Sequence, residues 1–218
     1  MRVMTHIENT SFYSHKQGGV LATHRSARGL ARMAAIIEAA VVVFARDGVD
    51  RATTNAIAAQ AGISPGSLYQ YFNDRTDILK AVVRDYISRL AEVYQAVWPT
   101  INATTPRPEM IAALLVPLAE FKRANATFAM IYAHPNLPAE LRQEVDGVNQ
   151  AFTTRLVALL AARNPATPRE TLELAARQAA CLFRGSLPLL GSVTGDEQRD
   201  TQELCTVLDA YLASRDIS

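Results

Sequence analysis

Apolar residues recur every three to four positions along most of the chain beyond residue 30, which is the period of one face of a helix. The first such run spans residues 31–47 and predicts an amphipathic helix. Its apolar positions are Ile36, Ala40, Val43 and Phe44. Gly48 follows directly, and glycine tolerates the left-handed conformation that commonly closes a helix. The helix is therefore expected to end at Asp47.

Two short helices separated by a glycine are predicted within residues 53–72. Thr53 supplies a side-chain acceptor for the first amides of one helix, and Gly62 ends it. Ser64 and Pro65 open the other helix, because serine caps free amides and proline has a helical φ and no amide to satisfy. The inward positions, four residues apart in each helix, are Ile57 with Ala61 and Leu68 with Phe72. This order of elements predicts a helix-turn-helix.

The remaining positions of the second short helix carry hydroxyl groups, an amide and aromatic rings. They are Pro65, Gly66, Ser67, Tyr69, Gln70 and Tyr71. Such groups suit contacts with phosphate oxygens and base edges in a major groove, and glycine allows close backbone approach. The alternative is an ordinary helical hairpin with no DNA contact. The coincidence of two capped helices, a glycine turn and a tyrosine pair favours DNA reading.

Six further helices are predicted beyond the motif. Asn73 or Asp74 caps the first of them, with Asp77 in a capping-box-like position, and the helix runs to Trp98. The others span residues 109–124, 128–132, 139–162, 171–187 and 196–213. Their helical spacing leaves no convincing strand pattern anywhere in the chain.

The fold class expected from this pattern is all-α, with about nine helices. Residues 100–108 are expected to form a loop, residues 134–138 to break the helices around them, and Pro117 to kink its helix. The predicted domains are a flexible N-terminal arm over 1–27, a three-helix helix-turn-helix DNA-binding domain over 28–75, and a larger C-terminal helical bundle over 76–218 for ligand binding and dimerisation.

Composition restricts the classes of protein that remain. The two cysteines, Cys181 and Cys205, lie in apolar helical patterns and read as small buried hydrophobes, so no oxidising compartment is required. No apolar run has transmembrane length and no signal peptide is evident, so we expect a cytoplasmic protein without membrane contact. His6, His15 and His24 are too far apart for a local metal site. No metal or cofactor is expected.

Charge is distributed unevenly although the net charge is only +1. Residues 1–85 hold ten Lys or Arg against seven Asp or Glu, whereas residues 86–218 hold twelve against fourteen. The basic excess therefore lies with the candidate DNA-reading helices.

Enzymatic alternatives receive little support. Residues 62–66 formally spell the G-x-S-x-G nucleophile motif, but that motif requires a preceding strand, and here a helix precedes. His134, before a proline at a helix break, is interpreted as a hinge residue. The remaining rivals are a helical-bundle small-molecule binding protein or enzyme without specific DNA binding, and a helical interaction module in which the motif merely packs.

A set of residues between about 30 and 82 matches a known signature. These residues are Ala39, Ala40, Phe44, Gly48, Thr53, Thr54, Ile57, Ala58, Ala61, Gly62, Ile63, Ser64, Leu68, Tyr69, Tyr71, Phe72, Ile78 and Leu79. They resemble the N-terminal DNA-binding signature of the tetracycline-repressor-like (TetR) family. One departure is Arg75, where the family usually has lysine at the start of its fourth helix.

The resemblance implies which residues touch DNA. Phosphate contacts are implied for Thr54, Tyr71 and Arg75, whose hydroxyl and guanidinium groups can reach a phosphate. Base-edge contacts are implied for Asn55, Pro65, Gly66, Ser67 and Tyr69. Tyr69 has an alternative place in the small core beside Leu68. The operator sequence does not follow, because the base-reading positions vary across the family.

The sequence is thus interpreted as a sequence-specific DNA-binding transcriptional regulator, a repressor released by a small, mainly apolar effector. The expected partners are a palindromic double-stranded DNA operator and a second copy of the chain. Aromatic, flexible and a few polar side chains are expected to form the effector pocket: Trp98, Met110, Leu114, Phe121, Asn125, Phe128, Tyr132, Asn149, Phe152 and Arg184. Dimerisation is expected through small and apolar residues of the last two helices: Ala175, Ala179, Leu182, Leu204, Val207, Leu208 and Leu212.

Overall fold

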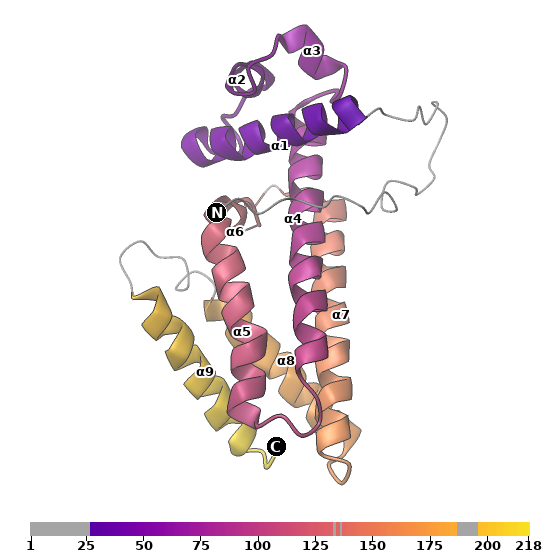
Figure 1. Cartoon of the computed structure of the whole chain (residues 1–218), viewed down its shortest axis with the longest axis vertical. Helices are drawn as coiled ribbons and strands as arrows, with labels where there is room; N and C mark the ends of the chain where they lie inside the picture. The colour runs from indigo at the N-terminus through magenta and orange to yellow at the C-terminus, as the bar shows by residue number, and fades with distance from the viewer. Residues whose placement is uncertain (1–26, 133, 136, 187–195) are drawn as a thin grey trace, which may run out of the picture.

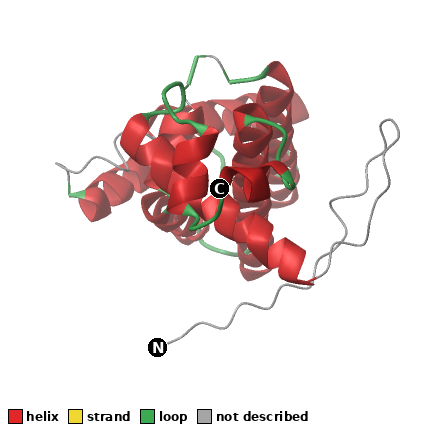
Figure 2. Cartoon of the chain, turned by 90° about the horizontal axis from the view of Figure 1, so that it is seen from above, coloured by secondary structure: helices red, strands yellow, loops and turns green. Residues whose placement is uncertain are grey.

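The computed structural model describes residues 27–132, 134–135, 137–186 and 196–218. Within these ranges the regular elements are nine α-helices and one short 3₁₀ helix, with no strand, so the all-α prediction is confirmed (Figure 2). The predicted N-terminal arm lies outside the described residues except for Ala27, which begins the first helix.

Three helices form a head at one end of the molecule, and a long helix connects it to a bundle (Figure 1). The head contains α1 (Ala27–Asp47), α2 (Thr54–Gln60) and α3 (Pro65–Tyr69). The connecting helix is α4 (Arg75–Val97), which ends in the 3₁₀ helix η1 (Trp98–Thr100). The remaining helices are α5 (Arg107–Ala124), α6 (Ala126–Tyr132), α7 (Ala139–Arg163), α8 (Arg169–Ser186) and α9 (Glu197–Ala213).

The N-termini of α2, α3 and α4 are capped by side chains that the sequence predicted as caps. Thr53 Oγ1 accepts from the Ala56 amide at 3.1 Å, and Ser64 Oγ accepts from the Ser67 amide at 3.2 Å. Asp74 Oδ1 accepts from the Asp77 amide at 2.8 Å. Each contact satisfies an amide that has no partner within its own helix. Asp74, rather than Asn73, is therefore the cap of α4.

Glycine allows the two sharp reversals of the head. Gly48 has φ 81° after α1, and Gly62 has φ 65° between α2 and α3. Both values lie in the left-handed region, where other residues are strained. The turn of the helix-turn-helix is therefore fixed by backbone conformation, as predicted.

Loop boundaries differ from the prediction in the middle of the chain. The loop expected over 100–108 is shorter, because Thr100 belongs to η1 and α5 already begins at Arg107. Pro108 lies in the first turn of α5, where the missing amide of proline costs no helical hydrogen bond. Pro117 lies inside α5, and the helix continues to Ala124.

The core of the head extends into the second half of the chain. Phe44, Ile57 and Leu68 are fully buried there, together with residues of α4. The same cluster contains four apolar residues of α6, α7 and the segment between them: Ile131, Leu137, Leu141 and Val145. Packing is thus continuous across residues 75 and 76, where the sequence analysis places a domain boundary.

A second cluster fills the far end of the bundle. It joins Trp98, Met110, Leu160 and Leu172 with residues of α9. At the C-terminal end, Arg107 donates to Asp209 Oδ1 at 2.7 Å and to the Ile217 carbonyl at 2.9 Å, and Asn164 Oδ1 accepts from the Ser218 amide at 2.9 Å. None of the described helices is both long and apolar enough to cross a membrane.

Candidate nucleic-acid interface and effector site

The outward surface of α2 and α3 carries the residues predicted to read bases. Asn55, Pro65, Gly66 and Tyr69 are exposed, and Ser67 is half-buried. Tyr69 exposes 52% of its surface, so the alternative that it belongs to the small core is wrong. Leu68 beside it is fully buried and holds α3 on the head. Four of the five predicted base-reading residues are therefore exposed to solvent, and the fifth is partly exposed.

Hydrogen bonds among these side chains order the surface. Thr54 Oγ1 and Tyr69 Oη lie 3.1 Å apart, which links the start of α2 to the end of α3. Ser67 Oγ lies 2.9 Å from Ser64 Oγ, which also accepts from the Ser67 amide. Ordered hydroxyl groups lose little conformational freedom on binding. The surface is thus arranged in advance for polar contacts.

Gly66 has a special place on this surface. A Cβ built at this position would meet only Ser64 Oγ, at 3.9 Å, which is an ordinary contact. The head itself therefore has room for a side chain at residue 66, unlike the left-handed Gly62. The packing of the head therefore does not require glycine at residue 66.

Tyr71 and Arg75 are less exposed than the base-reading set. Tyr71 packs partly buried against the head core. Arg75 Nη1 donates to the Val49 carbonyl at 2.6 Å and also to the Asp50 carbonyl. Arg75 thus ties the start of α4 to the loop between α1 and α2, a role that the sequence analysis did not anticipate. A guanidinium has several donors in a fixed plane, which an ammonium group lacks.

Positive charge flanks the reading surface rather than covering it. Neither α2 nor α3 contains lysine or arginine. Arg28 and Arg32 lie on α1, and Arg46 pairs with Asp47 at 2.7 Å. The hydrogen bond from Arg46 lowers the pKa of Asp47. The helix starts at Thr53 and Ser64 add the partial positive charge of their amides.

The loop between α1 and α2 also contacts the second half of the chain. His134 Nε2 lies 3.1 Å from Asp50 Oδ2, so the predicted hinge residue joins the connection before α7 to the head. Further along, Lys80 pairs with Glu140 at 2.6 Å and Arg84 pairs with Glu144 at 2.8 Å. These contacts attach the first turns of α7 to the upper part of α4.

A small apolar cavity of about 50 Å³ lies among α5, α7, α8 and α9. Three of the predicted pocket residues, Met110, Leu114 and Phe152, line it. The other lining residues are Ile111, Leu115, Leu118, Leu156, Ala179, Ala180, Phe183, Leu208 and Leu212. Most of these residues could not be singled out from the sequence, because their helical spacing is the same as that of other apolar core residues.

The other predicted pocket residues lie at several different places in the structure. Trp98 packs next to the cavity, with its ring centroid 5.4 Å from that of Phe152. Phe121 and Phe128 pack on Tyr86 instead, at centroid distances of 4.8 and 3.1 Å. Burial raises the pKa of Tyr86 far above its ordinary value. These rings form a separate aromatic cluster above the cavity.

The predicted polar contacts do not converge on the apolar cavity. Asn125 Nδ2 donates to the Phe121 carbonyl at 2.7 Å and so closes the end of α5. Asn149 lines a different hollow. Tyr132 and Arg184 lie in α6 and α8, but their side chains are outside the described part of the structure. The ten residues therefore do not line a single cavity.

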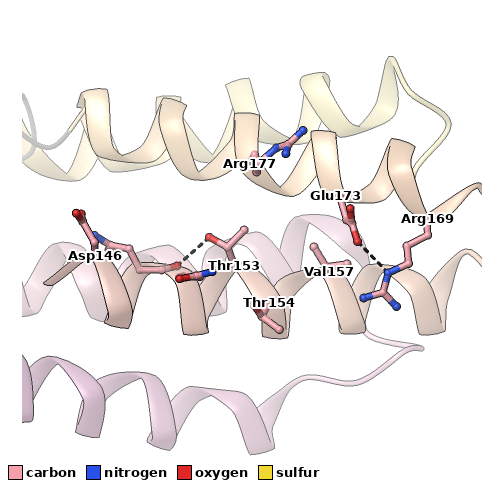
Figure 3. A pocket seen from close by; sticks show the side chains of 9 residues that line it. Asp146, Thr153, Thr154, Val157, Arg169, Glu173 and Arg177 are labelled. Atoms are coloured by element: carbon pink, nitrogen blue, oxygen red, sulfur yellow. Dashed lines mark hydrogen bonds and ion pairs between the residues drawn. The ribbon is translucent and has the colours of Figure 1, made fainter. Parts of the chain in front are cut away.

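The second hollow is a polar groove of about 650 Å³ between α7 and α8 (Figure 3). Its lining includes Asp146, Thr153, Arg177 and the ion pair between Arg169 and Glu173, at 2.8 Å. Thr153 Oγ1 donates to the Asn149 carbonyl at 2.9 Å within the groove. This groove is much larger than the apolar cavity, but its lining is mostly polar, and only Val157 of its lining residues is buried.

Most of the residues predicted to form a dimer interface belong to the core of the single chain. Five of the seven are at most 9% exposed: Ala175, Ala179, Leu204, Leu208 and Leu212. Leu182 of α8 and Val207 of α9 remain at the surface, with 39% and 43% exposed. The sequence argument from surplus apolar residues therefore applies to these two positions alone.

Sequence profiles of known families match both parts of the chain. The profile described as "Bacterial regulatory proteins, tetR family" matches residues 36–82. The profile described as "Tetracyclin repressor-like, C-terminal domain" matches residues 106–212. The first covers the helix-turn-helix and the start of α4, and the second covers α5 to most of α9.

Two named proteins are similar to this chain at 27–28% sequence identity. The HTH-type transcriptional regulator BetI of Rhizobium meliloti is 28% identical over 155 residues, which cover 71% of this chain and 75% of BetI. The nucleoid occlusion factor SlmA of Actinobacillus pleuropneumoniae is 27% identical over 117 residues, which cover 50% of this chain and 56% of SlmA.

Solved structures share the fold over most of the chain. The regulator FadR of Bacillus subtilis, in complex with stearoyl-CoA, matches with a TM-score of 0.62 and 21% identity, covering 83% of this chain and 97% of FadR. A TetR-like transcriptional regulator from Rhodococcus matches with a TM-score of 0.63 and 22% identity, covering 84% and 96%. With both family profiles and this fold, the chain belongs to the TetR family and is a DNA-binding transcriptional regulator.

Proposed function

We propose that this protein is a repressor that binds a palindromic operator as a homodimer and is released by a small, mainly apolar effector. The observation that supports the proposal is that the head and the bundle cavity lie at opposite ends of one long helix, α4. An exposed, ordered reading surface lies at one end of α4, and an apolar cavity lies beside the other end. A ligand that favours one arrangement of the bundle can shift the head through α4 and through the packing of α6 and α7 on the head core.

The DNA contacts are assigned to the outer surface of the head. Asn55, Pro65, Gly66, Ser67 and Tyr69 face base edges, and Thr54 and Tyr71 contact phosphates. Arg75 lies at the edge of this surface and is half-buried. Support comes from the exposure of α3 and from the hydroxyl groups held in place by the bond between Thr54 and Tyr69.

Dimerisation is assigned to the outer faces of α8 and α9. Leu182 and Val207 are large apolar side chains left exposed on these helices. A two-fold pair places two reading heads on one duplex, which explains why the operator is expected to be palindromic.

The effector is assigned to the apolar cavity rather than to the polar groove. FadR, which shares this fold, was solved in complex with stearoyl-CoA, a ligand with a long apolar chain. The twelve residues lining the cavity are all apolar, as a site for such a chain requires. We also propose that the chain is not an enzyme, because it belongs to a family of regulatory proteins.

The test is an operator titration with duplexes that carry palindromes from DNA flanking the gene. Purified protein is expected to bind one of them far more tightly than a shuffled duplex, with affinity falling steeply as salt rises. Tyr69→Ala and Ser67→Ala should change base preference by about 1–3 kcal/mol per lost contact. Equal affinity for shuffled DNA, unaffected by these variants, would contradict the proposal.

A further inference from the structure

The reading surface of the head supplies little of the positive charge that DNA binding requires. Neither α2 nor α3 contains lysine or arginine. A protein gains most of its sequence-independent affinity for a duplex from Lys and Arg side chains that neutralise phosphates and release counterions. The partial charges of the helix starts act only over a short range. The cations that bind the DNA backbone must therefore come from another part of the head.

The arginines nearest to the reading motif are already engaged in contacts within the head. Arg46 donates to both carboxylate oxygens of Asp47, at 2.7 and 2.8 Å. Arg51 Nε donates to the Asp47 carbonyl at 2.9 Å. Arg75 Nη1 donates to the Val49 carbonyl at 2.6 Å. Each of these side chains would have to give up or share a contact in order to bind a phosphate.

Arg28 and Arg32, in the first turns of α1, differ from these arginines. Both residues are exposed, and within the described part of the chain neither has a hydrogen bond or an ion pair. Because they are four residues apart, they lie next to each other on one side of the helix. Arg32 precedes the fully buried Ile36 by four residues, so it continues the side of α1 that packs on the head core. The first turns of α1 thus extend beyond that core and leave two free guanidinium groups there.

The position of this helix start and the charge of the chain around it both suit DNA. The indigo end of α1 lies on the same side of the head as α3 (Figure 1). Residues 9–37 form the longest stretch of the sequence without aspartate or glutamate, and they contain Lys16, Arg25, Arg28 and Arg32. A run of cations without carboxylates has a positive potential along its whole length, which attracts phosphates.

We propose that the start of α1 is a second DNA contact of the head, in which Arg28 and Arg32 bind phosphates beside the base pairs that α3 reads. This inference rests on the proposed operator binding and adds a contact outside the reading motif. Lys16 and Arg25, which precede α1, extend the contact to the duplex that flanks the half-site. The contact does not depend on base sequence, because it is made to the backbone.

The test measures how the affinity for DNA depends on salt. Full-length protein is titrated by fluorescence anisotropy into the candidate palindromic operator and into a shuffled duplex of the same length, at several salt concentrations. Arg28→Gln and Arg32→Gln should each reduce the slope of log affinity against log salt by about 0.9, which weakens binding about eightfold at roughly 0.1 M salt. The factor should be the same for both duplexes. Glutamine is a good helix former, so α1 should remain folded, and thermal melts verify this.

Two further variants separate a local contact from a change in total charge. Arg177→Gln is the matched control, because Arg177 is an exposed arginine of α8, in the bundle, with no hydrogen bond or ion pair among the described residues. It removes the same charge and should leave the slope unchanged. Arg32→Lys keeps the charge and should keep the slope of the parent.

The contribution of the segment before α1 is measured with duplexes of two lengths. The parent should bind a duplex with flanking DNA more tightly than one that ends at the half-sites. The double variant Lys16→Gln, Arg25→Gln should lose this gain. An equal gain for parent and double variant would contradict the extension of the contact to flanking DNA.

The slopes decide the inference. Slopes for Arg28→Gln and Arg32→Gln that equal the parent slope on both duplexes overturn it. Weaker operator binding at an unchanged slope also contradicts it, because α1 would then position the head without contacting a phosphate. Equal affinity of the parent for operator and shuffled DNA contradicts the proposed function, whereas the slope on the shuffled duplex still tests the contact made by α1.

Discussion

The head and the bundle differ in what holds their helices in place. In the head, α2 and α3 have only seven and five residues, and their ends are fixed by capping side chains and by Gly62. In the bundle, α5, α7 and α8 have 18 residues or more and are held by apolar packing between segments far apart in the chain. Local capping and turn chemistry therefore sets the ends of the short helices of the head, whereas long-range packing holds the helices of the bundle. The variants below separate these two contributions.

The largest effect is expected from a charge placed in the core of the bundle. Leu208 is 5% exposed and lines the apolar cavity, so Leu208→Glu buries a carboxylate without a partner and should cost more than about 4 kcal/mol of stability. The protein should fail to fold, as measured by circular dichroism and denaturant unfolding.

Val207 beside it is the matched position for the dimer. It is 43% exposed, so Val207→Glu should leave the fold intact and reduce the mass in sedimentation from dimer to monomer. Leu182→Glu should behave in the same way. Sedimentation that shows an unchanged dimer for both variants would place the interface elsewhere.

The two glycines of the reading motif are expected to respond in opposite ways. Gly62→Ala should destabilise the protein by about 1–2 kcal/mol, because alanine is strained at a positive φ. Gly66→Ala should leave stability unchanged or raise it by up to about 1 kcal/mol, because alanine is favoured in a helix and its methyl group has room.

The effect of Gly66→Ala on operator binding can be compared with its effect on stability. If DNA approaches α3 at residue 66, Gly66→Ala should weaken operator binding at least about tenfold, a loss of about 1.4 kcal/mol, despite its stable fold. Thermal melts and fluorescence anisotropy on the same samples measure the two effects. A variant that binds the operator as tightly as the parent would remove Gly66 from the interface.

Local signals explain why the sequence predicted the head so well. Thr53, Gly62, Ser64 and Asp74 each act within four residues of their own position, and the structure confirms all four. The exposure of Tyr69, by contrast, was left open by the sequence and is shown by the structure. A sequence pattern can specify such features because the interacting groups are neighbours in the chain.

The lining of the apolar cavity could not be predicted in the same way. Of the residues expected at the effector pocket, Met110, Leu114 and Phe152 line the apolar cavity, whereas Phe121 and Phe128 pack on Tyr86. Which apolar side chain faces which neighbour depends on how α5, α7 and α8 cross, and helical periodicity alone does not contain this information. The role of Arg75 was missed for the same reason, since its partners Val49 and Asp50 lie 26 and 25 residues away.

Arg75 gives a prediction that distinguishes two roles. If its contacts to Val49 and Asp50 position the head, Arg75→Ala should weaken operator binding by about 1–3 kcal/mol and leave the salt dependence unchanged. If it contacts a phosphate, the slope of log affinity against log salt should fall by about 1. Titrations at several salt concentrations separate the roles, and Arg28→Ala on α1 provides a comparison with another cation of the head.

The smallest effect is expected at the ion pairs between α4 and α7, which lie at the junction of the two regions. The hydrogen bond from Lys80 lowers the pKa of Glu140 from 4.5, and the bond to Glu140 raises the pKa of Lys80 from 10.5. A carboxylate with a depressed pKa in the folded state stabilises the protein above its unfolded pKa and loses this contribution as pH falls through the folded value. A lysine with a raised pKa stabilises below its unfolded pKa and loses the contribution as pH rises through the folded value.

The Lys80–Glu140 pair should therefore stabilise the protein between about pH 5 and pH 10 and weaken on both sides of that range. Glu140→Gln should reduce the melting temperature slightly at pH 7, and this difference should shrink as the pH falls through the depressed pKa of Glu140. Because both side chains are accessible to solvent, the difference should shrink further in 1 M salt. Melting curves for parent and variant from pH 3 to pH 7 measure it, and Glu109→Gln, on α5 and in no described ion pair, is the control. If the difference in melting temperature does not shrink as the pH falls, it has a cause other than this ion pair.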